Sequence, residues 1–240
     1  MRFNKVAVLG LTSLLAMSLV SQARENQSDI AVAGFAYADQ GDQWLYREDY
    51  IVLPDNRVEV VYSNQSGDVL ARKVLDYKTG LTTPSFYFHD SRFSVTKSAQ
   101  VTDALITLSL KTSEGEEKTV LQQESKQVID AGFTHFVRQH WNELLNDQAV
   151  EFFFALPNRG ENVELEVRKV TCEGETVDVL CFRFELANRF LAMFVDSIAL
   201  EFDEEMRLTR YSGRSNLSSD AGKDQDVIIT YQYFDQGQTL

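Results

Sequence analysis

The chain has 240 residues and a formal net charge of −13, with 36 Asp and Glu residues against 23 Lys and Arg residues. The basic residues are scattered along the chain and form no stripe. A surface this acidic repels phosphate backbones, whose neutralisation supplies most of the affinity of nucleic-acid binders, so nucleic acid is excluded as a partner.

Residues 1–23, "MRFNKVAVLGLTSLLAMSLVSQA", have the pattern of a secretory signal peptide. Arg2 and Lys5 precede an apolar run over 6–20, which is shorter than the ~20 residues that a membrane span requires. Small residues occupy the positions that a signal peptidase reads, which predicts cleavage between Ala23 and Arg24. Cleavage removes two bases and no acid, so the formal charge moves from −13 to −15. We expect an exported, periplasmic protein that does not span the membrane once the signal is removed.

Residues 24–43, "RENQSDIAVAGFAYADQGDQ", are expected to form a loosely ordered N-terminal segment. The rest of the chain contains no Pro-rich or Ser-rich linker and no convincing internal repeat. Its length suits one domain of ordinary size. We therefore predict a single β-rich domain over 44–235.

Strict alternation of apolar and polar residues dominates this domain, as is typical of half-buried strands. In "RVEVVYS" (57–63) Val58, Val60 and Tyr62 share a face. "ALITLSLKT" (104–112), "SIALEF" (197–202) and "DVIITYQY" (226–233) repeat the pattern. Short polar turns such as "LPDNR" and "SEGEE" separate the runs and favour antiparallel neighbours, because parallel strands need long crossovers.

These features predict a mainly β fold, a curved antiparallel meander of roughly ten to twelve strands. A sheet of that length must curl, close or split into layers to cover its apolar face. We expect an open or closed barrel-like sheet with one long amphipathic helix packed on its concave side.

The predicted helix spans 129–146, with Asp130 as its N-cap. At 100° per residue one broad apolar stripe emerges, made of Ile129, Phe133, Phe136, Val137, Trp141 and Leu144. His140 falls within the stripe, whereas His135 falls on the opposite, solvent-facing side. Gly132 weakens the first turn and suggests close packing there.

His140 has two readings. It is either a neutral core imidazole bonded to a neighbouring polar group, or a polar group placed in an apolar cavity. On the second reading the cavity lies between sheet and helix. Its predicted ligand-binding residues are Phe133, Phe136, Val137, His140 and Trp141.

The sequence contains no motif with the spacing of a known catalytic or cofactor site. His135 and His140 are five positions apart and cannot share a metal ion as an i, i+4 pair would. The stretch 213–226 contains Gly-Lys, but its spacing does not fit a phosphate-binding loop. We predict no metal site, no cofactor and no assigned catalytic residue.

Cys172 and Cys181 flank eight residues in a chain expected to be exported, where disulfides persist. Both fall on the non-core face of neighbouring strands, so their side-chain directions permit a bridge. A tight turn at 174–175 would set Cys172 opposite Val177, too far from Cys181 to bond. A looser turn or a bulge would bring the two cysteines together, and we favour the disulfide.

"DAGFTHFVRQHWNEL", "VEFFFALPNR" and "YSGRSNL" resemble a family of uncharacterised, signal-bearing, β-rich periplasmic proteins of Gram-negative bacteria. The resemblance covers about Tyr46 to Tyr233. It implies a periplasmic location and a domain of unknown function, and it brings no catalytic residues.

Three functions stay open on this basis. The first is binding or carriage of an apolar or amphipathic small ligand, a lipid-like molecule for example, in the cavity between sheet and helix. The second is an envelope-assembly or protein-interaction module with a solid core. The third is a hydrolase or isomerase that uses His140 with a carboxylate.

Overall fold

The computed structural model describes residues 30–39, 43–172, 178–187 and 197–234. These residues form one sheet of fifteen strands, almost entirely antiparallel, with two short helices. The first eight strands are β1 (Ile30–Ala38), β2 (Trp44–Leu53), β3 (Arg57–Ser63), β4 (Val69–Asp76), β5 (Ser85–Asp90), β6 (Val95–Thr102), β7 (Leu105–Thr112) and β8 (Gly115–Gln122). They are followed by β9 (Gln127–Ile129), α2 (Gly132–Gln139), α3 (Trp141–Leu145), β10 (Val150–Leu156), β11 (Glu161–Val170), β12 (Leu180–Leu186), β13 (Ile198–Phe202), β14 (Leu208–Arg214) and β15 (Asp226–Tyr233). Neither helix is long or apolar enough to cross a membrane.

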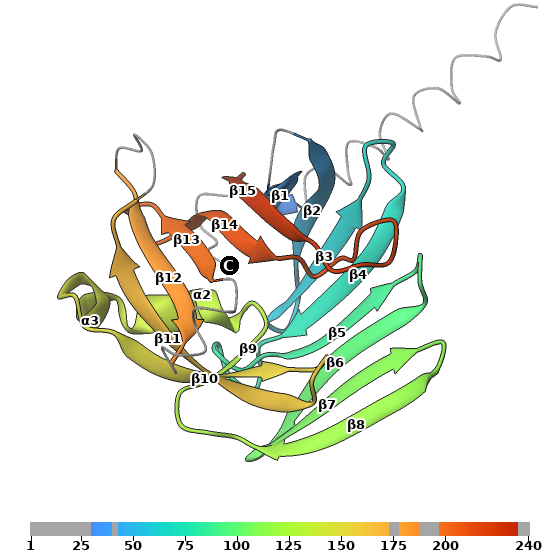
Figure 1. Ribbon diagram of the computed structural model, residues 1–240, viewed down its shortest axis with the longest axis horizontal. Helices are drawn as coiled ribbons and strands as arrows, with labels where there is room; N and C mark the ends of the chain where they lie inside the picture. The colour runs from blue at the N-terminus through green and yellow to red at the C-terminus, as the bar shows by residue number, and fades with distance from the viewer. Residues whose placement is uncertain (1–29, 40–42, 173–177, 188–196, 235–240) are drawn as a thin grey trace, which may run out of the picture.

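The described chain starts in the middle of the sheet. β1 lies between β2 and β15, and strands β2 to β8 extend from it in sequence order on one side. The chain then crosses to β9 at the other end and returns through β10 to β15. All neighbours are antiparallel except β9 and β10, which run parallel. The result is two wings that curl toward each other about β1 and β15 (Figure 1).

The wings approach each other at their free ends but are not joined by strand pairing, because β8 and β9 occupy opposite ends of the strand order. A Cβ added at Gly160, in the β10–β11 turn, would lie 2.6 Å from Thr119 Oγ1 on β8. The Ile129 N–H of β9 donates to the Thr82 carbonyl in the β4–β5 loop at 2.9 Å. The sheet is therefore open and strongly curved, which is the open form of the predicted meander.

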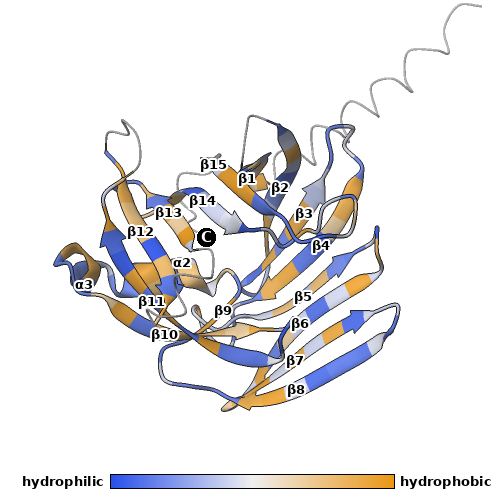
Figure 2. Ribbon diagram, viewed as in Figure 1, coloured by the Kyte–Doolittle hydropathy of each residue, from blue (hydrophilic) through white to orange (hydrophobic). Residues whose placement is uncertain are grey.

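The predicted alternation places the core correctly. In β3 Val58, Val60 and Tyr62 are buried and their neighbours are less so. Ile106 and Leu108 in β7 and Val227 and Ile229 in β15 follow the same rule. Bands of hydrophobic and hydrophilic residues alternate along the strands in Figure 2. The buried apolar residues form two clusters. Most residues of the first belong to β2–β7, and those of the second belong mainly to the two helices and to β10–β14.

The prediction for the N-terminal segment was wrong over 30–38. These residues form the central strand β1, in which Val32, Ala33 and Ala36 are fully buried. The run "IAVAGFAYA" lacks clean alternation because both of its faces are covered, and such strands are hard to recognise from periodicity. The signal segment and its cleavage site lie outside the described residues.

The single long helix over 129–146 was also wrong. Ile129 belongs to β9, and His140, with φ −102° and ψ 16°, separates α2 from α3. Asp130 is not the N-cap, because its φ of 45° places it before the helix and Ala131 takes that position. The apolar stripe itself is confirmed, since Phe136, Val137, Trp141 and Leu144 are buried against β10–β13. In Figure 1 both helices lie beside this wing.

Gly132 confirms the expected close packing at the helix entry. A Cβ at this position would lie 2.2 Å from the Thr82 carbonyl oxygen and 2.9 Å from Pro84 Cδ. The first turn of α2 therefore rests directly on the backbone of the β4–β5 loop.

Replacing Gly132 with Ala is expected to lower the free energy of unfolding by about 1–3 kcal/mol, the usual cost of overpacking. The same change in an unobstructed helix would stabilise it by about 1 kcal/mol, so the sign itself reports the contact with Thr82. Urea denaturation measures the effect. Gln139→Ala, at an exposed position of the same helix, serves as the control and should stay within about 0.5 kcal/mol. A stabilised Gly132→Ala variant would contradict the packing.

Candidate functional site

A cavity of about 250 Å³ lies on the inner face of the curved sheet, with residues of both wings and of α2 in its wall. Its lining is mainly apolar and aromatic, and includes Val32, Val58, Leu75, Phe86, Phe88, Phe133, Phe154, Phe184, Ile198, Leu208 and Ile229. Ligand sites commonly combine such a wall with a few polar groups that fix orientation.

The polar part of the wall is formed chiefly by charged side chains that occupy core positions of the strands. Glu48 on β2 is 2% exposed and Lys73 on β4 is 3% exposed. Asp130, in the short link between β9 and α2, also lines the cavity. A buried charge lowers the stability of the fold unless it is paired or hydrogen-bonded, so the partners of these side chains determine whether they can be tolerated.

Lys73 and Asp130 form a buried ion pair. Lys73 Nζ donates to Asp130 Oδ1 at 2.7 Å, and the Ala131 N–H donates to the same oxygen at 2.7 Å. The left-handed backbone of Asp130 turns the chain from β9 into α2 and aims its carboxylate at β4. The pair thus fastens the helix entry to the opposite wing.

Glu48 accepts a hydrogen bond from the Tyr50 hydroxyl at 2.7 Å. Burial raises the pKa of Glu48, while the Tyr50 hydrogen bond and the charge of Lys73 act in the opposite direction. Gly34, opposite Glu48 in β1, makes room for it, because a Cβ there would lie 3.3 Å from Glu48 Oε2 and 3.0 Å from Tyr231.

Tyrosines surround this group. Tyr50 and Tyr231 pack edge to face with ring centroids 6.1 Å apart. Tyr77 and Tyr211 also line the cavity, and burial raises the pKa of both hydroxyls. These tyrosines stay protonated at neutral pH and present hydroxyls rather than charges.

Of the predicted ligand-binding residues, only Phe133 lines this cavity. Phe136, Val137 and Trp141 pack in the cluster between the helices and β10–β14. His140 is also absent from the lining; its side chain is 17% exposed and its Nδ1 lies 2.8 Å from Glu143 Oε2. The stripe was predicted correctly as buried, but most of it serves packing.

His135 was expected to face solvent, but it is half-buried against Tyr77, with ring centroids 5.4 Å apart. Burial lowers the pKa of His135 to about 4, and the nearby charge of Arg138 acts in the same direction. The unfolded value is about 6.5. The folded state therefore favours the neutral ring, and its contribution to stability is lost as the pH falls from 6.5 toward 4.

Between pH 7 and pH 4.5 we expect His135 to cost about 1–2 kcal/mol of unfolding free energy, after allowance for its partial exposure. The measurement is the difference between wild type and His135→Gln in urea denaturation at several pH values. This difference cancels other groups such as Glu48, whose raised pKa adds stability as the pH falls. Parallel pH profiles for the two proteins would show that His135 does not titrate with folding.

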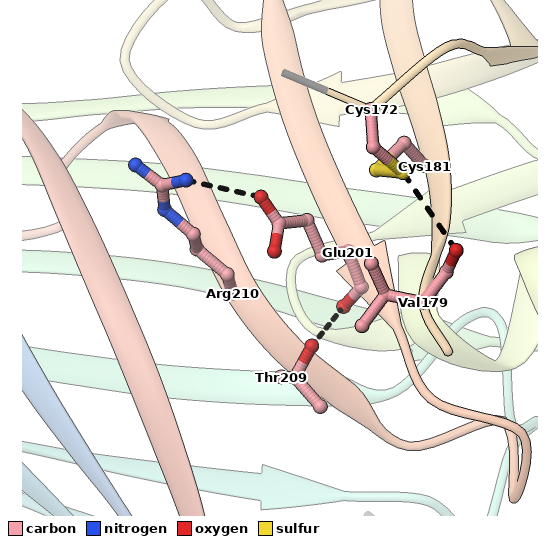
Figure 3. The surroundings of a disulfide bond; sticks show 6 residues. All are labelled: Cys172, Val179, Cys181, Glu201, Thr209 and Arg210. Atoms are coloured by element: carbon pink, nitrogen blue, oxygen red, sulfur yellow. Dashed lines mark hydrogen bonds and ion pairs between the residues drawn. A yellow bond between two sulfur atoms is a disulfide. The ribbon is translucent and has the colours of Figure 1, made fainter. Parts of the chain in front are cut away.

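The disulfide between Cys172 and Cys181 is present, with an S–S distance of 2.05 Å and a Cα–Cα distance of 5.2 Å. Val170 pairs with Cys181. A tight turn at 174–175 would instead have paired Val170 with Val179, two residues earlier in the chain. Cys172 therefore lies diagonal to Cys181 and close to Val179 (Figure 3). This register brings the two cysteines together, and the bond suits an extracytoplasmic location.

Among the described residues, no three His, Cys, Asp or Glu side chains are gathered in a way that could hold a metal ion. Comparisons with protein-family models, with curated proteins and with solved structures give no match. The cavity is therefore the feature of this chain from which a function can be inferred.

Proposed function

We propose that this protein binds or carries an apolar or amphipathic small ligand in the cavity between its curved sheet and α2. The observation that carries the proposal is the aromatic cavity of about 250 Å³ with a few buried polar side chains in its wall. A solid-core interaction module has no need of buried charges around an open space, and burying them costs stability. We further propose a periplasmic location, on the strength of the expected signal segment and the disulfide.

The test is native mass spectrometry of the full chain purified from the periplasm. A co-purified lipid-like mass is expected with the wild type. Ala131→Leu places a larger side chain in the cavity wall and should reduce the bound fraction, whereas Ala149→Leu, at an exposed position after α3, should not. A protein that carries no such mass and has no affinity for added amphiphiles would contradict the proposal.

A hydrolase or isomerase is the second candidate, because His140 has a carboxylate partner in Glu143. Such a pair can act as a general base. The pair lies outside the cavity lining, and Glu143 is half exposed. His140→Gln should leave ligand binding unchanged under the first proposal and abolish turnover under the second.

A further inference from the structure

Lys97 is a cation in the cavity wall that has no carboxylate partner among the residues that the structure describes. It lies on the inner face of β6, in the same alternation as the buried residues Ala99 and Val101. Its Nζ lies 5.6 Å from the centroid of the Phe88 ring. Within the described part of the chain, no acidic side chain lies within ion-pair distance of this ammonium, and no hydrogen-bond acceptor contacts it. A half-buried ammonium without an ion-pair or hydrogen-bond partner is costly, and a single aromatic ring offsets only part of that cost.

Lys73 lies in the same cross-strand row. Phe88 on β5 pairs with Lys73 on β4 and with Lys97 on β6, so the two lysines flank one phenyl ring. Two strand spacings separate their backbones by roughly 10 Å, which two long side chains can bridge through one ligand group. The Lys73 ammonium has three donors and uses one for Asp130.

The local charges favour an anion near Lys97 in particular. Asp130 compensates Lys73, but it does not contact Lys97. Burial lowers the pKa of Lys97, and the charge of Lys73 acts in the same direction, whereas the carboxylates of Asp224, Asp130 and Asp90 act in the opposite direction. Glu48 is the remaining acid of the wall; it accepts a hydrogen bond from the Tyr50 hydroxyl, and burial raises its pKa.

We infer that Lys97, with Lys73, receives the anionic head group of a single-chain amphiphile, a carboxylate or a phosphate, whose chain lies against the aromatic wall. This inference rests on the proposed ligand-binding function and specifies its ligand class. The two ammonium groups supply charge-assisted hydrogen bonds to the head group, and Phe88 between them begins the apolar surface on which the chain packs.

Isothermal titration of the full chain tests this with decyl phosphate, decanoate, decanol and inorganic phosphate. The wild type should bind both anionic amphiphiles about tenfold or more tightly than decanol, as expected for a hydrogen bond to a charged group. Lys97→Gln should lose about tenfold in affinity for the anions and leave decanol unchanged. Lys97→Arg keeps the charge and should retain anion binding. Lys111→Gln, the same change at an exposed position of β7, is the matched control and should bind as the wild type does.

The outcomes separate the two proposals. If decanol binds as tightly as the anions, and Lys97→Gln binds all three amphiphiles as the wild type does, the head-group inference fails and the ligand-binding function stands. If none of the three amphiphiles binds to the wild type, the ligand-binding function fails. If inorganic phosphate binds as tightly as decyl phosphate and its binding requires Lys97, the site binds a free anion. That result would overturn the inference that the ligand is an amphiphile.

Discussion

Phe136→Ala is expected to lower the free energy of unfolding by about 3–5 kcal/mol, as large-to-small changes of a buried phenylalanine do. Phe136 is 1% exposed, and its ring centroid lies 4.8 Å from that of Phe152 on β10. It is the central contact between α2 and the wing formed by β10–β13. Removing the ring leaves a void that the neighbouring strands cannot close, because their spacing is fixed by the ladder hydrogen bonds.

Phe234→Ala is the matched control for this prediction. Phe234 is 51% exposed, so the same truncation should cost about 0.5 kcal/mol or less. Guanidinium denaturation followed by tryptophan fluorescence measures both variants. A loss below about 1 kcal/mol for Phe136→Ala would mean that α2 is not packed on the sheet as the structure has it.

The fold class could be predicted because the signal is repeated. Several strands, such as β3, β7 and β15, each carry their own alternation, and one misread strand does not change the meander. The pairing of β1 with β15 was not predicted, since it joins strands from the two ends of the described chain. No local pattern in "IAVAGFAYA" encodes that contact, and a strand covered on both faces loses the polar positions that reveal a period of two.

In the helical segment, the apolar pattern predicted which side chains are buried but not where the helices begin and end. The apolar stripe predicted correctly that Phe136, Val137, Trp141 and Leu144 are buried. It did not reveal the interruption at His140, nor the start of the segment as β9, because a short apolar run fits a strand and a helix equally well. Tertiary contacts with Thr82 and with Lys73 decide the entry of α2.

The polar part of the candidate site was missed, although the sequence held a usable signal. Glu48 alternates with Tyr46 and Tyr50, Lys73 alternates with Ala71 and Leu75, and Lys97 with Ala99 and Val101. These are charged residues in core positions of otherwise apolar strand faces. The curvature of the sheet brings the three strands to one cavity, and this curvature could not be predicted from the sequence.

Lys73→Met is expected to lower the free energy of unfolding by about 3 kcal/mol. Breaking a buried ion pair at one partner costs about 3–5 kcal/mol, because the other charge is left buried. The lower end applies here, since Asp130 retains the hydrogen bond from the Ala131 N–H. The effect should be visible as a lower urea midpoint with an unchanged slope.

The second substitution separates the charge from the packing. Asn tolerates the left-handed backbone that Asp130 requires, and it keeps a carbonyl oxygen for the Ala131 N–H. Asp130→Asn in the Lys73→Met background removes the uncompensated carboxylate and should recover most of the lost stability, because replacing both members of a buried pair is often neutral. Lys78→Met, at the exposed pair with Asp55 whose atoms are 4.0 Å apart, should change stability by less than about 0.5 kcal/mol. If the double variant is no more stable than Lys73→Met alone, the loss arises from packing of the lysine chain, and the ion pair does not hold α2 to β4.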